Sequence, residues 1–380
     1  MKVRLGSILQ EFKAQPPKGS NPEVLTLTER NGFVRQSDRF SKRLATEDVS
    51  GYKYVELDDF AFNPYLLWAG AIARNGRFTN GVISPLYPTF RVTPGNYAGY
   101  VERLVLSQQM ISAYDNIAFG SVPRRRRSSV KDFLALEVPA LPPLDEQRRI
   151  AAILDKADEL RTKRREALAH LETLTQSIFH SMFGDPVRGN RWPLHRLEEL
   201  GRWQSGGTPS RSKASNFIGD IPWYSSGELE TKSLGMPKEY ISDAGLASSS
   251  AKLIQPGSLL LGMYDTAALK SGITKFPSSC NQAIAFARLD DSLASTDFVY
   301  HCIQIGRTHY MRLQRGVRQK NLNLSMIKGL QVPLPPLDLQ QTFAARVAAV
   351  ERLKETHRKH LAELDTLFAS LQHRAFKGEL

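Results

Sequence analysis

The feature that most constrains this chain is a short passage that occurs twice. Residues 138–150 read VPALPPLDEQRRI, and residues 332–343 read VPLPPLDLQQTF. Aligning the two Pro-Pro-Leu-Asp cores gives an offset of 193 residues, which holds without a gap for about forty residues. Self-similarity at a fixed distance indicates repeated structural units. We expect two units of about 190 residues, each a globular part followed by a helix.

Each copy of the passage leads into an apolar pattern typical of a coiled-coil helix. Apolar residues recur in steps of four and three, with one polar position, Arg164 or His357, in the middle. The mean step of 3.5 residues is that of a coiled-coil seam. The first seam is predicted to contain Ile150, Leu154, Ala157, Leu160, Leu168, Leu171, Leu174 and Ile178. The second is predicted to contain Phe343, Val347, Val350, Leu353, Leu361, Leu364, Leu367 and Leu371.

The prolines set the start of each helix, because a residue before proline is disfavoured in the helical region. Asp145 and Asp338 are predicted as the N-caps. One helix leaves the first globular part and the other leaves the second, so they pair along their length only if they run antiparallel. Thirty-six helical residues would span roughly 54 Å. The alternative is two core helices inside separate domains, but the shared seam and polar position favour pairing.

The expected fold class is α+β, with two globular domains separated by two long helices that form an antiparallel, pseudo-twofold symmetric coiled coil. The predicted ranges are a globular domain over 1–140, a helix over 141–185, a second domain over 186–333 and a helix over 334–380.

Within the globular domains, alternating β-branched and aromatic residues bounded by turn formers predict short strands. These stretches lie at 52–64, 82–92, 257–264 and 282–289, and a helical pattern covers 298–306.

Positive charge is confined to the globular domains. The chain carries a net charge of +13, of which residues 1–140 hold +6 and residues 186–333 hold +7. The two helical ranges are nearly neutral, at −1 and +1. This distribution favours a polyanion that contacts the two domains while the helices space them.

Four basic, amide-rich segments are candidates for contact with DNA: 30–43, 124–129, 204–213 and 315–323. Arg and Lys bind phosphate and guanine, and Gln and Asn read adenine. The alternative is that each segment is a solvated loop. The candidate DNA-binding residues are Arg35, Gln36, Ser41, Lys42, Arg43, Arg124, Arg125, Arg126, Arg127, Thr208, Ser210, Arg211, Lys213, Arg315, Arg318, Gln319, Lys320 and Asn321.

Several classes of protein are disfavoured by the sequence. No apolar run is long enough for a membrane span, and the start lacks the apolar core of a signal peptide, so we expect a cytoplasmic protein without a membrane partner. Two cysteines without a CxxC pair argue against a zinc site or disulfide framework. No metal ligands and no cofactor bound by this chain are predicted.

No catalytic residues are predicted either. FNPYL (62–66) lacks the glycine-rich motif that would accompany a methyltransferase site, and VELDDF (55–60) lacks a second acidic cluster for a nuclease metal site. The chain contains no Walker loop. Two alternatives remain open: a scaffold that binds other proteins without reading DNA, and an enzyme with an undetected site, such as self-contained methylation.

The doubled passage carries a resemblance to a known family. LPPLDEQRRIAAIL and LPPLDLQQTFAARV, each continuing into a helix, resemble the repeated regions of type I restriction–modification specificity subunits. The stretch at 205–229, SGGTPSRSKASNFIGDIPWYSSGEL, is similar to the opening of that family's target-recognition domain. The stretch at 36–67 resembles another class of recognition domain, and AFKGEL (375–380) resembles the usual C-terminal ending.

The resemblance implies a function that composition and spacing do not give. Residues 1–140 and 186–333 would be target-recognition domains, each reading one half of a bipartite site in double-stranded DNA. The helices would act as spacer and dock two methyltransferase subunits, and restriction translocase subunits would join that complex in phage defence. S-adenosylmethionine is expected in the methyltransferase, and ATP and Mg in the restriction subunit.

Overall fold

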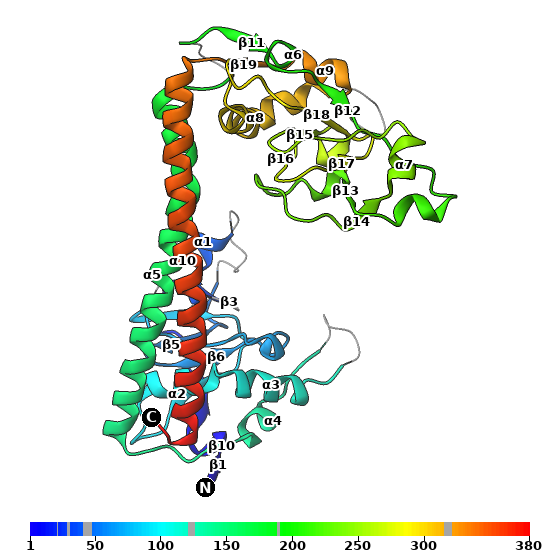
Figure 1. Cartoon of the computed structure of the whole chain (residues 1–380). Coiled ribbons are helices and arrows are strands. Elements are labelled where there is room, and N and C mark those ends of the chain that lie inside the picture. The colour runs from blue at the N-terminus through cyan, green and yellow to red at the C-terminus, as the bar shows by residue number, and fades with distance from the viewer. Residues whose placement is uncertain (21, 29–30, 41–47, 121–125, 188–190, 315–320) are drawn as a thin grey trace. The chain divides into compact units, whose positions relative to one another are not determined.

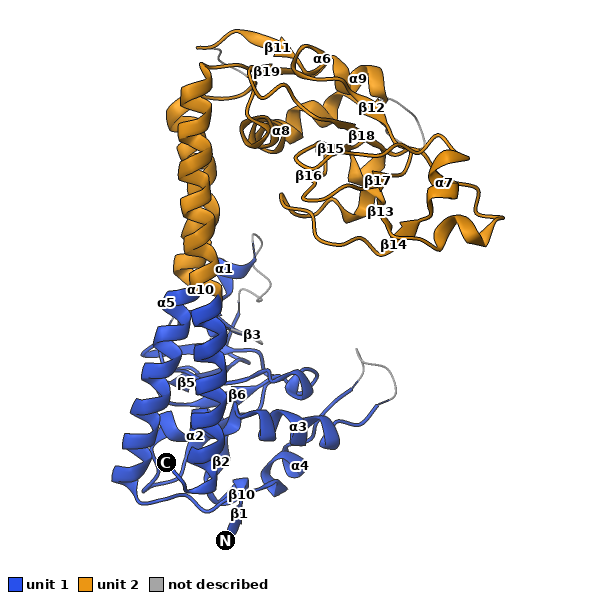
Figure 2. Ribbon diagram, viewed as in Figure 1, with its two compact units in different colours: residues 1–165, 359–380 blue, residues 166–358 orange. Residues whose placement is uncertain are grey.

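The structure is a computed structural model that describes residues 1–380 except 21, 29–30, 41–47, 121–125, 188–190 and 315–320 (Figure 1). The chain divides into two compact units, shown in Figure 2. Unit 1 comprises residues 1–165 and 359–380, and unit 2 comprises residues 166–358. Each unit therefore combines a globular part with segments of two long helices, and each has its own hydrophobic core.

Unit 1 is built around a four-stranded antiparallel sheet in the order β2-β9-β6-β7. These strands are β2 (Leu9–Phe12), β6 (Phe60–Phe62), β7 (Ile72–Arg74) and β9 (Thr89–Val92). Three further pairs are β1 (Lys2–Arg4) with β10 (Glu137–Pro139), β3 (Leu25–Thr28) with β4 (Gly32–Arg35), and β5 (Lys53–Glu56) with β8 (Asn80–Ile83). The short helices are α1 (Gln36–Arg39), α2 (Ala98–Val105), α3 (Gln108–Ile117), α4 (Val130–Ala135) and the 3-10 turns η1 (Leu5–Ser7) and η2 (Leu67–Ala69).

The core of unit 1 is aromatic. Phe62 of β6 and Phe90 of β9 stack with their ring centroids 5.6 Å apart, and Phe133 of α4 packs on both at 4.9 and 5.3 Å. All three rings are fully buried. Aromatic side chains on one face of the sheet therefore hold the short helices against it.

Unit 2 contains a four-stranded antiparallel sheet in the order β12-β18-β15-β16 and a three-stranded sheet in the order β14-β13-β17. The strands are β11 (Leu194–Arg196), β12 (Gln204–Ser205), β13 (Ile221–Tyr224), β14 (Glu239–Ile241), β15 (Leu259–Gly262), β16 (Ser271–Ile273), β17 (Ser279–Cys280), β18 (Ile284–Ala287) and β19 (Gln331–Pro333). The helices are α6 (Leu197–Leu200), α7 (Asp243–Ala247), α8 (Thr296–Tyr310), α9 (Leu324–Lys328) and the turns η4 (Ala214–Phe217), η5 (Ser226–Glu228), η6 (Asp265–Ala267) and η7 (Met311–Leu313).

The two units repeat one topology although their globular sequences differ. In both four-stranded sheets the first strand pairs with the fourth, the fourth with the second, and the second with the third. In both units a two-stranded pair, β1–β10 or β11–β19, then joins the start of the globular part to the residues just before the prolines. The α+β fold class and the internal repeat are thereby confirmed.

The long helices are α5 (Leu144–Phe183) and α10 (Leu337–Lys377). Each begins one residue before the aspartate predicted as its N-cap, so that prediction is wrong. Asp145 and Asp338 instead lie in the first helical turn, where the positive end of the helix dipole favours a carboxylate. Both helices end at a glycine with left-handed backbone, Gly184 at φ 79° and Gly378 at φ 76°. No helix in the described ranges is long and apolar enough to cross a membrane.

The two long helices run antiparallel within each unit. In unit 1, Arg161 of α5 donates from Nε to Asp365 of α10 at 2.6 Å. In unit 2, Phe179 of α5 meets Phe343 of α10 with ring centroids 5.5 Å apart. The later part of one helix thus lies beside the earlier part of the other, as an antiparallel coiled coil requires.

The seam differs from the prediction at four positions. Leu160, Leu174, Leu353 and Leu367 are 42, 39, 51 and 48% exposed. In each case the next residue takes the inward position: Arg161, Thr175, Lys354 and Phe368 are buried or partly buried. With these residues the steps along the seam alternate strictly between four and three, whereas the predicted seam contained two successive steps of three. The heptad register therefore overrides the apolar character of single residues.

Two of the four replacements are charged and remain inward for an identifiable reason. Arg161 lays its guanidinium 4.3 Å from the centroid of the Phe368 ring and pairs with Asp158 and Asp365. Lys354 pairs with Glu351 at 2.7 Å. Long cationic side chains bury their aliphatic stems and keep the charge paired, so they can occupy seam positions.

Candidate nucleic-acid interface

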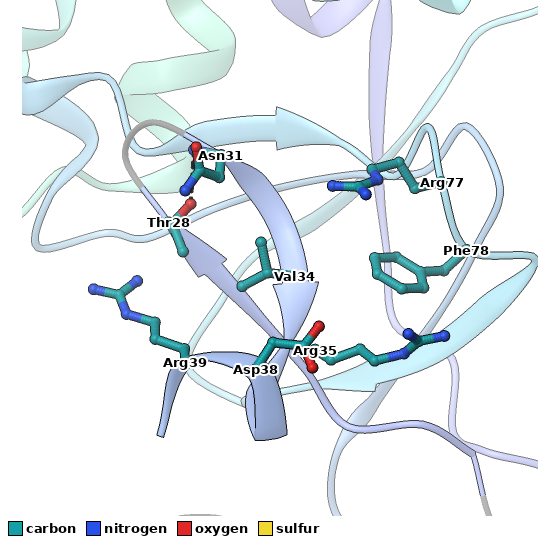
Figure 3. Close-up of a pocket in the computed structure, with 8 residues that line it drawn as sticks. All are labelled: Thr28, Asn31, Val34, Arg35, Asp38, Arg39, Arg77 and Phe78. Atoms are coloured by element: carbon teal, nitrogen blue, oxygen red, sulfur yellow. Dashed lines mark hydrogen bonds between the residues drawn. The ribbon is translucent and has the colours of Figure 1, made fainter. Parts of the chain in front are cut away.

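Unit 1 has an open cavity of about 660 Å³ between the β3–β4 hairpin, α1 and the loop after β7 (Figure 3). The residues that line it are Thr28, Asn31, Val34, Arg35, Asp38, Arg39, Arg77 and Phe78. Three guanidinium groups and one carboxylate therefore surround a space with an aromatic ring in its wall. A polyanion would be attracted to this cavity, and the carboxylate adds an acceptor for a hydrogen-bond donor.

The hairpin side of the cavity is fixed by a local hydrogen-bond pattern. Thr28 Oγ1 accepts the Asn31 N–H at 2.9 Å and donates to the Gly32 carbonyl at 3.1 Å. Gly32 has φ 58°, a backbone conformation that glycine adopts without strain. These contacts hold Asn31 at the rim of the cavity.

Arg35, one of the predicted DNA-binding residues, forms part of the cavity wall. Its Nε donates to Glu23 at 2.5 Å, and its guanidinium lies 5.7 Å from the centroid of the Phe78 ring. The adjacent Gln36 begins α1, and its N–H donates to the Val24 carbonyl at 2.9 Å. Glu23 thus holds Arg35 in place and offsets part of its charge.

The opposite wall contains Arg77 and Phe78, which are not among the DNA-binding residues predicted from the sequence. Buried Asn75 clamps their loop: its Nδ2 donates to the carbonyls of Glu56 and Phe78 at 2.9 and 2.8 Å, and its Oδ1 accepts the Phe78 N–H at 3.0 Å. Arg77 is exposed and forms no hydrogen bond or ion pair with any other described residue. An Asn-Gly turn followed at once by arginine was the available signal.

Nine of the predicted residues lie outside the described residues: Ser41, Lys42, Arg43, Arg124, Arg125, Arg315, Arg318, Gln319 and Lys320. The other nine are placed by the structure: Arg35, Gln36, Arg126, Arg127, Thr208, Ser210, Arg211, Lys213 and Asn321. DNA contact by all eighteen stays a prediction.

Arg126 and Arg127 lie against unit 1 rather than extending from it. Arg126 donates to the Asp115 carboxylate at 2.6 Å and to the Asp115 carbonyl at 2.7 Å, with its guanidinium 5.5 Å from the centroid of the Trp68 ring. Arg127 places its guanidinium 5.6 Å from the Tyr65 ring centroid. Arg126 therefore contributes to the structure of unit 1, whether or not it also contacts DNA.

In unit 2, Arg211 is held rigidly on an aromatic surface. Its Nη1 and Nη2 donate to the two carboxylate oxygens of Glu239 at 2.5 and 2.8 Å. Its guanidinium stacks 4.2 Å from the Phe217 centroid and 5.4 Å from the Trp223 centroid. The pairing lowers the pKa of Glu239. This geometry leaves the outward edge of the guanidinium in a fixed orientation.

The glycines beside Arg211 serve packing rather than an exposed turn. A Cβ at Gly206 would collide with the Cys280 carbonyl, and one at Gly207 would collide with the backbone of Ala251. The Trp223 Nε1–H donates to the Gly207 carbonyl at 3.0 Å. The glycine pair therefore lets this segment lie directly against the core of unit 2.

The remaining predicted residues of unit 2 have mixed surroundings. Thr208 hydrogen-bonds Gln282, and the Ser210 hydroxyl contacts a neighbouring serine hydroxyl at 2.8 Å. Lys213 is exposed and has no ion-pair partner in the part of the chain that the structure describes. Asn321 Oδ1 accepts a backbone N–H from η6 at 3.1 Å. Of this group, Lys213 is the one most available to a ligand.

The motifs considered for catalysis have structural partners. Asn63 of FNPYL accepts the Tyr65 N–H at 3.0 Å and so shapes a turn. The carboxylates of Asp58 and Asp59 pair with arginines of unit 1 at 2.7 and 3.0 Å. Burial raises the pKa of the Asp59 carboxyl and of both cysteine thiols. Among the described residues, no three His, Cys, Asp or Glu side chains are grouped to hold a metal ion.

In each unit, the segments of the long helices present a further candidate surface with two exposed leucines. Leu160 and Leu367 belong to unit 1, and Leu174 and Leu353 belong to unit 2. The repeat offset of 193 relates Leu160 to Leu353 and Leu174 to Leu367. Each leucine directly precedes a seam residue, and in an antiparallel pair such positions flank the same side of the seam. Each unit thus has an equivalent exposed leucine pair.

Comparison with known proteins supports one family. The family model described as "Type I restriction modification DNA specificity domain" matches residues 190–366. The specificity subunit of the type I restriction enzyme EcoR124I/EcoR124II from Escherichia coli is 25% identical over 151 residues. That match covers 38% of this chain and 37% of the relative, so it spans little more than a third of the relative's length.

Solved structures show the same fold over the whole chain. A chain from a structure on complex assembly and conformational transition of the type I R-M system matches with a TM-score of 0.65 and 18% identity, covering 100% of this chain and 98% of that chain. The type I restriction-modification system S subunit from M. genitalium matches with a TM-score of 0.59 and 13% identity. This match covers 99% of this chain and 96% of that chain. In its doubled helices and in the domain matched over residues 190–366, the chain is similar to type I restriction–modification DNA specificity subunits.

Proposed function

We propose that this chain reads a bipartite site in double-stranded DNA, with one half-site for each unit. The observation that supports this most directly is the repeat itself: two units share one strand order and one closing strand pair. Their globular parts hold the excess positive charge, which is +6 over residues 1–140 and +7 over 186–333. Two similar cationic domains joined by helices suit two separate contacts with one duplex.

We assign the long helices a second task, the docking of two methyltransferase subunits. An isolated exposed leucine is common on protein surfaces. Here four exposed leucines fall at two repeat-related pairs, one pair in each unit. Equivalent surfaces suit two copies of one partner.

The chain itself contributes recognition, and its partners contribute the chemistry. S-adenosylmethionine would bind to the methyltransferase subunits, and ATP and Mg to restriction translocase subunits that join the complex. We place this assembly in the cytoplasm, where it meets DNA. Because the chain catalyses no reaction in this proposal, the acidic and FNPYL motifs serve its structure, through the partners described above.

The test is to express the full chain with its methyltransferase in a host that lacks DNA methylation and to map the methylated positions. The expected result is a motif of two fixed blocks separated by a gap of constant length. A contiguous motif, or no methylation that depends on this chain, would overturn the proposal. The methyltransferase expressed without this chain is the control.

A further inference from the structure

Resting on the proposed DNA reading, we propose that the cavity of unit 1 reads the major-groove edge of a G·C base pair. Arg77 donates to the guanine, and Asp38 accepts from the cytosine amino group. Guanine presents two acceptors, N7 and O6, in the major groove, and cytosine presents the N4 donor. One cationic donor and one anionic acceptor across a single cavity match that pattern.

The carboxylate separates base reading from phosphate binding. Figure 3 shows the Asp38 carboxylate and the Arg77 guanidinium directed into the same space from opposite walls, with the Phe78 ring beside them. The arginines would attract a phosphate to this space, but a phosphate offers no hydrogen-bond donor to the Asp38 carboxylate, whereas a base-pair edge presents acceptors to Arg77 and a donor to Asp38. Within the described chain, the Asp38 carboxylate has one long contact, from the Ser37 hydroxyl at 3.5 Å.

Two of the three arginines that line the cavity differ in role: Arg35 supports the wall, and Arg77 reads the base. Arg35 is tied to Glu23 and lies against Phe78, so it shapes the wall. Arg77 has no such partner among the described residues, and the Asn75 clamp fixes the loop that carries it. The backbone that carries the Arg77 donor is therefore fixed before DNA arrives, which favours discrimination of one base from another.

The experiment is a selection from a duplex library with randomised blocks, using the full chain assembled with its methyltransferase. The wild type and the variants Arg77→Ala, Arg77→Lys and Asp38→Ala are compared. We expect all three variants to relax the same G·C position of one half-site by roughly 10- to 100-fold and to leave the other half-site unchanged. Arg77→Lys keeps the charge but loses bidentate geometry, so it should relax that position while it retains general affinity.

The outcomes separate the two proposals. The control Arg148→Ala removes one positive charge from α5 and should leave every position of the motif unchanged. If the wild type enriches a bipartite motif but the variants keep all its positions, the base-reading proposal fails and the proposed function stands. A uniform loss of affinity on all sequences, with a shallower salt dependence, would assign Arg77 to phosphate and also overturn it. If the wild type enriches no motif, both proposals fail.

Discussion

Gln147 and Gln340, which the repeat relates to each other, make the same hydrogen bonds in the two units. Gln147 Oε1 accepts the N–H of Tyr97, the N-cap of α2, at 2.8 Å, and Gln340 Oε1 accepts the N–H of Ser295, the N-cap of α8, at 2.9 Å. Each Nε2 donates at 2.8 Å to the carbonyl of the first proline in its Pro-Pro pair. Both amides are buried. The doubled passage therefore fastens each long helix to its own globular part.

This relationship predicts a stability defect confined to one unit. Replacing Gln147 with alanine leaves the Tyr97 N–H and the Pro142 carbonyl without their partner, which we expect to cost unit 1 about 2 kcal/mol. Urea unfolding followed by hydrogen exchange, which resolves the two units, measures the loss. The matched control is Gln341→Ala, an exposed glutamine next to Gln340. Equal effects of the two variants would show that the buried amide bonds contribute little.

A second prediction concerns the ion pairs that hold α2 to α5 and α10. Asp158 accepts from Arg103 at 3.0 Å and from Arg161 at 2.9 Å, and both arginines are mostly buried. Asp158→Ala would leave two partly buried guanidinium groups underpaired, so we expect unit 1 to lose about 1 to 2 kcal/mol. Glu159 is the control, because it pairs with two lysines that are exposed. Removing Glu159 should cause no measurable change, and a loss as large as that of Asp158→Ala would contradict the assignment.

His301 predicts a pH dependence for unit 2. This side chain is buried, its Nε2 has no hydrogen-bond partner among the described residues, and its ring packs on Phe343 at 5.3 Å. Burial lowers the pKa of His301 to about 4, with further effects from Lys232, Asp297, Glu351 and Lys354 around it. Because the ordinary value is 6.5, the unfolded chain binds more protons between pH 6.5 and 4.

The stability contributed by neutral His301 is thus fully present above pH 6.5 and decreases as the pH falls toward 4. The total loss is up to about 3 kcal/mol. His301→Phe should remove this slope in urea midpoints measured from pH 7 to 4. The same substitution at the exposed His309 should leave the slope as in the wild type. A slope that persists in His301→Phe would place its origin elsewhere.

The exposed leucines predict how partner subunits dock. Changing Leu160 and Leu367 to glutamate should remove one methyltransferase subunit from the complex, because charge replaces apolar surface at one of two equivalent pairs. Changing all four leucines should remove both subunits. Native mass spectrometry of the co-expressed complex gives the stoichiometry. Leu86→Glu, at a 63% exposed leucine of unit 1 outside the helices, is the control. A complex with two methyltransferase subunits after the first change would refute docking at these pairs.

The repeat made the long helices and their direction predictable, because the proline passage and the heptad pattern are local signals. The seam was misplaced at Leu160 and Leu353 because apolar character was weighted above strict register. Arg161 and Lys354 take the inward positions there, and each pairs with an acidic residue three positions earlier on its own helix. Arg161 also pairs with Asp365 of the other helix, a contact between distant segments that is not visible in a single sequence.

The shared strand order of the sheets and the cavity of unit 1 were harder to predict from the sequence. Short strands pair across long insertions, so the order of β2, β6, β7 and β9 follows from tertiary packing rather than from periodicity. Arg35 was found because it lies in a basic segment, whereas Arg77 is an isolated basic residue in its loop. Its position opposite Asp38 also depends on the hydrogen bond from Asn75 to the carbonyl of Glu56, which is distant in sequence and is not revealed by a local pattern.

If two units joined by a helical spacer read two half-sites, the length of the spacer sets the distance between them. The most direct test inserts one heptad into each long helix at matching levels, between Arg165 and Glu166 and between Arg358 and Lys359. Seven residues add about 10 Å while keeping the seam in register. The control inserts the heptad into α5 alone, which should disrupt pairing and abolish site-specific methylation.

The measurement is the methylated motif of the doubly lengthened chain, mapped beside that of the wild type. We expect the same two blocks of bases with a gap longer by roughly three base pairs, since each pair occupies about 3.4 Å. An active variant that methylates sites with the original gap would contradict this expectation.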